Sequence, residues 1–400
     1  MHILMIAPEP FFEPRGTPFS EFHRIRALTT IGHTVDLVTY PFGRDVELPG
    51  LRIFRCLRPP FLSHAKIGPS WAKVPLDAAL ALTAMRLAAT RKYDAVHSHE
   101  EGGGIGVVLA GLLRIPHLYD MHSSLPQQVE NFGYKGAGPF LAPVLRWLER
   151  LMINRSRVVI VICAELEVTV RSIRTDVPMV LIENAPGSGD RPVDGTGAAV
   201  REQLGLAPST PVALYTGTFE HYQGLDLAYA AMQIVVKTRP DARLVMVGGD
   251  PAQVAAARRH VDTMGLTDAV VFTGQRPAEE IPSYLDAATV LLSPRSSGTN
   301  TPLKIYQYLR SGRPIVATNL RTHTQVLSPD VAFLADPTPE AFAAVLLAAF
   351  SDPARAAAIG AAAKQLAETR YSDEAYMAKT RTACGLLFDT PAGEVQRGVA

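Results

Sequence analysis

The sequence predicts an α/β protein built from two doubly wound, parallel-sheet (Rossmann-like) domains that face a central cleft. Short apolar runs of strand type alternate with longer segments of helical period, a pattern typical of parallel sheets covered on both faces. The pattern starts again after a stretch rich in glycine, proline and aspartate, APGSGDRPVDGTG at 185–197. With 400 residues, the chain is also longer than most single domains. We therefore place an N-terminal domain at 1–184 and a C-terminal domain at 198–370.

Runs of valine, isoleucine and leucine locate the strands of both domains. In the N-terminal domain they predict strands at 2–7, 34–39, 51–56, 95–97, 117–121 and 158–162, with helices at 18–31, 76–90, 103–113 and 140–154. In the C-terminal domain they predict strands at 212–215, 243–247, 269–272, 290–292 and 314–317, with helices at 225–237, 251–264, 279–287 and 302–311. Such sheets bind ligands beyond the carboxyl ends of their strands, so we expect the site there.

Composition excludes several classes of protein. A formal net charge of +1 provides no general field for gathering nucleic acid, so any anion must be held by a local site. The three cysteines show neither the spacing of a zinc site nor an even number for pairing, which favours a reducing, cytoplasmic location. The longest apolar runs fall short of the ~20 residues that a membrane span needs. The chain starts in a strand pattern without a basic leader, and we expect a soluble body.

The segment SSGTNTPLKIYQYLRSGRPIV at 296–316 predicts a phosphate-binding loop and helix. Thr301 suits an N-cap, and Pro302 suits the first helical position, where its missing N–H costs nothing. Free amides around Leu303 and Lys304, the helix dipole and the Lys304 ammonium would converge on one point, which is how an α/β protein holds a phosphate. The stretch alone is equally compatible with a well-capped helix that carries a solvated lysine.

A similar start, Gly16-Thr17-Pro18, follows the first predicted strand. The strand runs directly into Ala7-Pro8-Glu9-Pro10, so the dinucleotide fingerprint G-x-G-x-x-G is absent. Hydride-transfer enzymes of that type are therefore disfavoured.

Several motifs in a fixed order resemble those of the retaining glycosyltransferases of family four, which have the GT-B fold. They are the glycine loop at 8–16, YDMHSS at 119–124, ALYTGTFEHYQGLDL at 213–227, RLVMVGGD at 243–250, VVFTGQRP at 270–277 and SPRSSGTNTPLKIYQYLRSGRPIVAT at 293–318. The resemblance covers nearly the whole chain. It implies transfer of a sugar from a nucleoside diphosphate sugar to a hydroxyl acceptor, without a metal or other cofactor.

The resemblance also implies roles for individual residues. His122 would lie against the transferred sugar, and its alternative is a hydrogen-bonded core histidine at a strand end. The residues themselves, rather than the resemblance, add Lys304 at the diphosphate as the second catalytic candidate. From their place directly after the predicted strand at 95–97, and not from the resemblance, Glu100 or Glu101 could meet acceptor hydroxyls. The candidate donor-binding residues at family positions are Gly16, Gly217, Thr218, Gln223, Thr299, Asn300, Thr301, Pro302, Leu303 and Gln307, and our interpretation of the loop adds Arg295.

This sequence departs from the family pattern at three places. Thr218 and Gln223 stand where the family usually has an arginine and a lysine, so two cations expected at the diphosphate are missing. Thr299 and Gln307 occupy the positions of a glutamate pair spaced E-x7-E, although a glutamine carbonyl can still accept from ribose. We expect Lys304 first, and Arg295 second, to compensate. The alternative is a nucleotide-sugar binding protein with weak or no transferase activity.

Three further segments carry hypotheses. His97 and His99 share a strand face, but nothing distant completes a ligand set, so we prefer a pair lining the acceptor side over a metal site. The segment at 63–93 places basic residues among apolar ones, which suggests peripheral contact with an anionic membrane, at the inner membrane surface, and a lipid-linked or polysaccharide-precursor acceptor; its alternative is a core helix with a solvated basic side. By resemblance, the amphipathic segment 371–388 packs back on the first domain.

Overall fold

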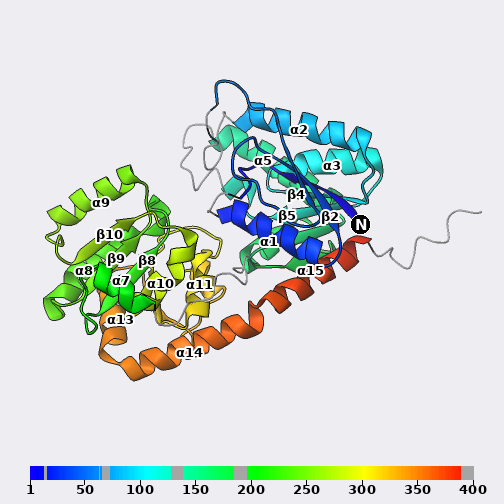
Figure 1. Ribbon diagram of the computed structural model, residues 1–400. Coiled ribbons are helices and arrows are strands. Elements are labelled where there is room, and N and C mark those ends of the chain that lie inside the picture. The colour runs from blue at the N-terminus through cyan, green and yellow to red at the C-terminus, as the bar shows by residue number, and fades with distance from the viewer. Residues whose placement is uncertain (13–15, 63, 65–72, 128–137, 184–195, 389–400) are drawn as a thin grey trace, which may run out of the picture. The chain divides into compact units, whose positions relative to one another are not determined.

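The computed structural model describes residues 1–12, 16–62, 64, 73–127, 138–183 and 196–388 (Figure 1). The chain divides into two compact units, unit 1 (Met1–Asn184 and Tyr376–Ala400) and unit 2 (Ala185–Ala375). The predicted linker at 185–197 lies outside the described residues except for its last two positions, and most of 63–72 lies outside them as well.

Unit 1 is built on a parallel sheet with the order β3-β2-β1-β4-β5-β6-β7. The strands are β1 (His2–Ala7), β2 (Thr34–Thr39), β3 (Leu51–Arg55), β4 (Ala95–His99), β5 (His117–Met121), β6 (Val158–Val161) and β7 (Met179–Leu181). All but β7 were predicted; this edge strand has only three residues, two of them half-buried, which is too short for a period to show. The strand order changes direction at β1, which pairs with β2 on one side and β4 on the other.

Helices cover both faces of this sheet. One face packs against α1 (Gly16–Thr30) and α15 (Asp373–Phe388), and the other against α2 (Lys73–Thr90), α3 (Gly102–Leu113), α5 (Gly138–Arg155) and α6 (Ala164–Ile173). The later part of α15 belongs to unit 1, where Ala383 and Leu387 are buried against Leu118 and Ile160. Ile3 to Ala7 of β1 are at most 1% exposed, as expected of a central strand covered on both sides.

Unit 2 repeats the design with a parallel sheet in the order β10-β9-β8-β11-β12-β13. The strands are β8 (Val212–Thr216), β9 (Arg243–Val247), β10 (Val270–Gly274), β11 (Val290–Ser293), β12 (Ile315–Thr318) and β13 (Phe333–Ala335). The helices are α7 (Gly197–Gln203), α8 (Leu225–Thr238), α9 (Pro251–Thr263), α10 (Ile281–Ala287), α11 (Lys304–Ser311), α12 (Arg321–Thr324), α13 (Pro339–Ser351) and α14 (Pro353–Arg370), with short 3₁₀ turns at His221–Gln223 and Ala278–Glu280. Here the order changes direction at β8, which pairs with β9 and β11.

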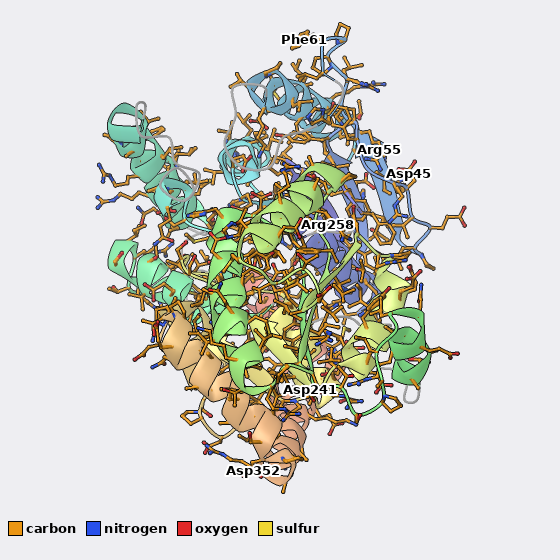
Figure 2. All side chains as sticks on the ribbon, turned by 90° about the vertical axis from the view of Figure 1, so that its left-hand side faces the viewer. Asp45, Arg55, Phe61, Asp241, Arg258 and Asp352 are labelled. Carbon is orange, nitrogen blue, oxygen red and sulfur yellow. The ribbon has the colours of Figure 1, made fainter. Side chains whose placement is uncertain are left out.

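Local sequence explains where several of these helices begin. Asp250 caps α9 by accepting from the Gln253 amide at 2.8 Å, and the Gln253 side chain accepts from the Asp250 amide in return. Asp352 caps α14 in a similar way, through the Arg355 amide at 2.9 Å. Figure 2 labels Asp352 and, in unit 1, the Arg55–Asp45 ion pair that joins β3 to the segment before it.

Within the described ranges, none of the single helices has both the length and the apolar composition needed to cross a membrane. One consecutive pair, Pro339–Ser351 with Pro353–Phe388, passes on length and composition only, and it is bent by 100°.

Candidate active site

The carboxyl ends of β8 and β11 define the candidate site of unit 2. These strands are neighbours at the position where the strand order changes direction, and such positions leave a crevice for ligands. Gly217 follows β8 directly, and the loop from Pro294 to Leu303 joins β11 to α11. The predicted residues of both segments are therefore brought to the same edge of one sheet.

Lys304 is the first residue of α11 and lies under this edge. Its ammonium donates to the side-chain oxygen of Gln223 at 3.2 Å and lies 3.7 Å from the centre of the Tyr215 ring. A Cβ placed on Gly217 would come within 3.1 Å of the Lys304 nitrogen. Gly217 is exposed, whereas Lys304 is only 9% exposed. The buried ammonium is therefore separated from solvent at this point by a glycine, which has no side chain to cover it.

The charge on Lys304 has no carboxylate beside it among the residues that the structure describes. Burial is the main cause that lowers the pKa of Lys304 well below its ordinary value, and the nearby Arg295 lowers it further. A buried ammonium with only an amide oxygen and an aromatic ring as partners is costly in the unliganded protein. An anion at Gly217 would provide the missing charge.

Arg295 shapes the loop that approaches this site. Its guanidinium donates to the carbonyls of Ser297 at 2.8 Å and Asn300 at 3.2 Å, and it lies 5.1 Å from the centre of the Tyr222 ring. Burial lowers the pKa of Arg295. Gly298 is required here, because it has a φ of 106° and its Cβ would lie 2.6 Å from the guanidinium.

Helix α12 holds the same loop from the other side. The Thr322 hydroxyl donates to the backbone carbonyl of Asn300 at 2.6 Å, and the side-chain amide of Gln325 donates to the backbone carbonyl of Thr299 at 2.7 Å. Thr299 and Asn300 thus use their backbone oxygens to fix the loop.

The start of α11 differs from the prediction. The helix runs Lys304–Ser311, with Leu303 rather than Thr301 at the N-cap and with no side-chain cap. Pro302 and Leu303 form tight turns instead, because their carbonyls accept from Ile305 at 3.0 Å and Tyr306 at 3.2 Å. The predicted cap is wrong: the Thr301 hydroxyl is buried and makes no hydrogen bond to the described residues. Thr301 therefore brings an unused polar atom to the loop.

The remaining predicted residues of unit 2 lie around this centre. Gln307 is half-buried on α11, three positions after Lys304. Thr218 is exposed, and its carbonyl accepts from the Tyr215 hydroxyl at 2.7 Å. The Tyr308 hydroxyl accepts from the Thr216 amide at 2.9 Å, which ties α11 to the end of β8.

Unit 1 gathers polar side chains at the carboxyl ends of β1, β4 and β5. His122 follows β5, is 4% exposed, and lies 3.3 Å from Asp120 and 3.2 Å from His99. Glu100 follows β4 in a left-handed conformation, with a φ of 46°, and accepts from Ser123 at 2.8 Å. Burial raises the pKa of Glu100 to about 8. Glu101 is paired with Lys73, and Gly16 begins α1 directly after the residues outside the described ranges.

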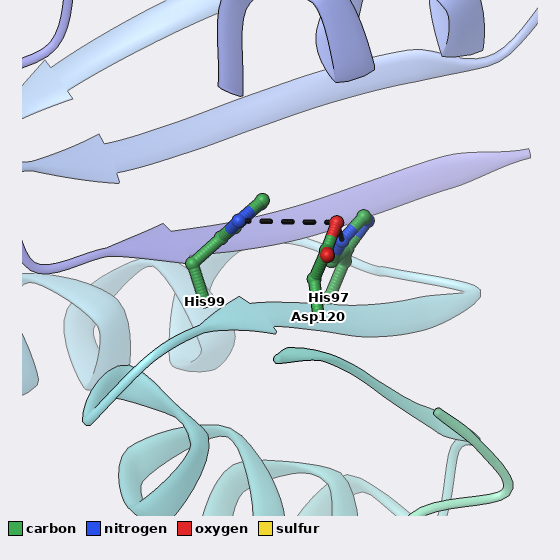
Figure 3. A group of neighbouring side chains, drawn as sticks. All are labelled: His97, His99 and Asp120. Carbon is green, nitrogen blue, oxygen red and sulfur yellow. Dashed lines mark hydrogen bonds and ion pairs between the residues drawn. The ribbon is translucent and has the colours of Figure 1, made fainter. Parts of the chain in front are cut away.

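His97, His99 and Asp120 place one potential ligand atom each within 4.8 Å of one another (Figure 3). The expectation that no third ligand lies near the two histidines is therefore wrong, because β5 brings Asp120 beside them. However, Asp120 Oδ2 already accepts a hydrogen bond from Arg24 Nε at 2.8 Å. The guanidinium would repel a metal cation bound to the same oxygen. That the protein uses no metal stays a prediction.

Comparison with known proteins decides the family. The family model described as glycosyl transferases group 1 matches residues 198–366, and the model described as glycosyl transferase 4-like domain matches residues 23–185. The two models therefore cover most of both units. The chain belongs to the family-four glycosyltransferases.

A curated relative and two solved structures are similar to this glycosyltransferase. The D-inositol 3-phosphate glycosyltransferase of Corynebacterium urealyticum is 28% identical over 318 residues, which are 73% of this chain and 72% of the relative. The sucrose-phosphate synthase of Thermosynechococcus elongatus has a TM-score of 0.79 at 21% identity, covering 97% of this chain and 99% of that one. The Anabaena protein Alr3699/HepE in complex with UDP has a TM-score of 0.73 at 17% identity, with 97% and 99% covered. These likenesses show the GT-B fold, as predicted.

Sequence reasoning missed two residues next to His122 in this glycosyltransferase. Asp120 precedes His122 by two positions, a spacing that places side chains on the same side of an extended segment, so a signal was present. Arg24 lies in α1, and only the packing of that helix over β5 brings it to Asp120. No local pattern in the sequence reveals such a pairing.

Proposed function

We propose that the protein transfers a sugar, with retention of anomeric configuration, from a nucleoside diphosphate sugar to a hydroxyl group of a glycan or lipid-linked acceptor. The observation that carries the proposal is the buried Lys304 ammonium beneath Gly217, which has an amide oxygen, an aromatic ring and Arg295 around it but no described carboxylate. A diphosphate on Gly217 would neutralise this charge. The UDP bound to the similar Anabaena protein supports a nucleoside diphosphate as the ligand.

In this proposal the cations stabilise the leaving diphosphate, which is the main electrostatic demand of the reaction. Lys304 and Arg295 supply positive charge, and Gly217 and the turn at Pro302 allow the backbone to approach the phosphates. Gln307 accepts from the ribose, and His122 contacts the transferred sugar. Glu100 and Glu101 face the acceptor side.

The competing proposal, a nucleotide-sugar binding protein with weak or no transferase activity, rests on the uncharged residues at 218, 223, 299 and 307, where the family usually has charged ones. The structure offers a reason for Gln223, because its oxygen accepts from Lys304 at 3.2 Å. A lysine there would set two ammonium groups against each other in a buried place. Gln223 thus complements Lys304, which favours an active transferase.

Binding and transfer can be tested in sequence. We expect one of UDP, GDP and ADP to raise the melting temperature, since a ligand at 100 times its Kd stabilises the folded state by about 2.7 kcal/mol. The sugar donors of that nucleotide should then be hydrolysed slowly, or transferred when an acceptor is present. No shift with any diphosphate would contradict the donor site, whereas a shift without hydrolysis or transfer would favour the binding protein.

A second part of the proposal is peripheral contact with an anionic membrane. Every large hydrophobic residue that is exposed in the described part of the chain belongs to unit 1. Seven of them lie on three helices of one face, where α3 packs between α2 and α5: Val74, Leu82, Met85, Val108, Leu112, Val144 and Trp147. Phe61, before α2, is 73% exposed and projects from the surface in Figure 2.

The same face, here called the α2–α3–α5 face, carries exposed arginines. They are Arg86 on α2, Arg114 after α3, and Arg146 and Arg150 on α5. Its acidic residues, Asp77 and Glu149, are half-buried and buried. Exposed apolar side chains with cations around them fit an interface with anionic lipids.

Reversing these charges should weaken membrane binding. We expect Arg86→Glu and Arg146→Glu together to reduce binding to phosphatidylserine vesicles at least tenfold, because each basic residue near such a surface is worth about 1 kcal/mol. Arg259→Glu, an equal charge reversal at an exposed position of α9 in unit 2, is the matched control. Flotation at low salt measures the effect, and a folded wild-type protein that stays with the soluble fraction would rule the contact out.

A further inference from the structure

We propose that Arg24 and Asp120 form a buried ion pair that holds His122 as a positively charged imidazolium, which makes Asp120 a positioning residue for this histidine. The charge state follows from unit 1 alone. Only its use, as a hydrogen-bond donor toward the transferred sugar, rests on the proposed function.

The geometry begins with Asp120, whose side chain is fully buried near the end of β5. One oxygen, Oδ2, accepts from Arg24 Nε at 2.8 Å and lies 3.3 Å from His97 Nε2. The other, Oδ1, lies 3.3 Å from His122 Nε2. The two oxygens thus face different partners: the Arg24 hydrogen bond holds Oδ2, and Oδ1 lies within ion-pair distance of His122.

Arg24 keeps the fully buried carboxyl group of Asp120 ionised. The guanidinium is 2% exposed, lies in α1, and stacks on the Tyr376 ring at 5.1 Å from its centre. Burial alone would raise the pKa of Asp120, but Arg24 first and His122 second hold it well below its ordinary value. An ionised carboxylate is therefore present beside His122.

The neighbouring histidines do not compete for the proton. Burial is the main cause that lowers the pKa values of His97 and His99, so both rings are neutral. His99 Nδ1 lies 3.2 Å from His122 Nε2, and the neutral His99 ring can accept a hydrogen bond from the N–H of His122 there. Burial would lower the pKa of His122 as well, but Asp120 outweighs it and the net shift is upward.

The other ionisable groups that face His122 act in the same direction. Glu100, after β4, and Glu9, after β1, both raise the pKa of His122 through their negative charge. Their own pKa values are raised by burial, to about 8 for Glu100, so the effect of Glu100 grows as the pH approaches 8. Two other carboxyl groups act on these neighbours: Glu21 of α1 and Glu9 influence each other's pKa, and Glu101 pairs with Lys73.

Nuclear magnetic resonance of ring-labelled histidine tests the charge directly, with His122→Gln to assign the signal. In the wild-type protein we expect the His122 ring to titrate above 6.5, its ordinary value. In Asp120→Asn the midpoint should fall by roughly one to three pH units, the effect of one close opposite charge. A wild-type ring that is already neutral at pH 6.5 would overturn the proposal, and so would an unchanged midpoint in a folded Asp120→Asn protein.

Asp36→Asn is the matched control. Asp36 is also a buried aspartate of the same sheet and pairs with Arg52 at 2.7 Å and Arg91 at 2.8 Å, but it lies in β2. It should leave the His122 titration unchanged. The wild-type titration still tests the charge of His122 even if Asp120→Asn does not fold.

An activity readout separates the two levels of the proposal. If transfer occurs, the alkaline limb of the rate should move to lower pH in Asp120→Asn and disappear in His122→Gln. If no transfer is found at all, the proposed function fails while the titration still reports on Asp120.

Discussion

Lys304→Met is expected to lower the rate of sugar transfer by roughly ten- to a hundredfold and, at the same time, to raise the stability of the unliganded protein. The first effect follows because a charge-assisted hydrogen bond is worth about 1.5–3 kcal/mol and each 1.36 kcal/mol changes a rate tenfold. The second follows because methionine has a similar length and leaves no buried charge. A substitution that raises stability but lowers activity is typical of a buried charged residue whose role is to bind a ligand.

The pH dependence of protein stability is a second, independent test of the buried Lys304. The pKa of Lys304 in the folded protein lies well below its ordinary value of 10.5, so between the two values the unfolded chain binds more protons than the folded one. Stability therefore rises with pH across that window. Lys304→Met should lose this rise.

Urea unfolding at several pH values and a rate assay with the preferred donor measure both effects. Lys237→Met, at an exposed lysine in the last turn of α8, is the control and should change neither. If Lys304→Met destabilises the protein and leaves the rate intact, the lysine has a structural role and the phosphate site lies elsewhere.

The strands and most helices could be predicted because the sheets are central and buried. In β1 and β8 nearly every residue is apolar and covered on both sides, so the run of hydrophobic residues marks the strand directly. At Lys304 the prediction was less complete. The motif located the lysine, but the helix starts two residues later than Pro302 and the Thr301 hydroxyl does not cap it.

Local sequence patterns could not predict side-chain contacts between residues of distant elements. From the sequence, Gln223 was interpreted only as the loss of a family lysine. In the structure its side-chain oxygen accepts a hydrogen bond from Lys304, 81 residues away. Arg24 meets Asp120 across 96 residues for the same reason. Side-chain pairs of this kind depend on which helix covers which strand, and hydrophobic period does not encode that choice.

Arg295→Met should also reduce transfer by roughly ten- to a hundredfold, a loss comparable with that of Lys304→Met. Methionine removes a positive charge and also the hydrogen bonds to the Ser297 and Asn300 carbonyls, which hold the loop before α11. Arg295→Lys keeps the charge but cannot reproduce this fork, so its loss should be smaller than that of Arg295→Met. The comparison separates the charge from the shape of the loop.

Arg258→Met is the control for the loss of a stacked arginine. Arg258, labelled in Figure 2, donates to the Phe272 carbonyl at 3.0 Å and lies 5.2 Å from the centre of the Phe272 ring, so its contacts resemble those of Arg295. It lies in α9, away from Lys304. Transfer by Arg258→Met should be close to that of the wild type.

Proton uptake on nucleotide binding tests whether Arg295 and Lys304 serve the same anion. Burial first and Arg295 second lower the pKa of Lys304, so part of the lysine should be neutral before binding and take up a proton when a diphosphate arrives. Calorimetry in buffers of different ionisation enthalpy should show uptake in the wild type, less in Arg295→Met, and none in Lys304→Met. The double variant should lose less activity than the product of the single losses, because both cations act on one ligand. Full additivity with unchanged uptake in Arg295→Met would mean that the two side chains act on separate groups.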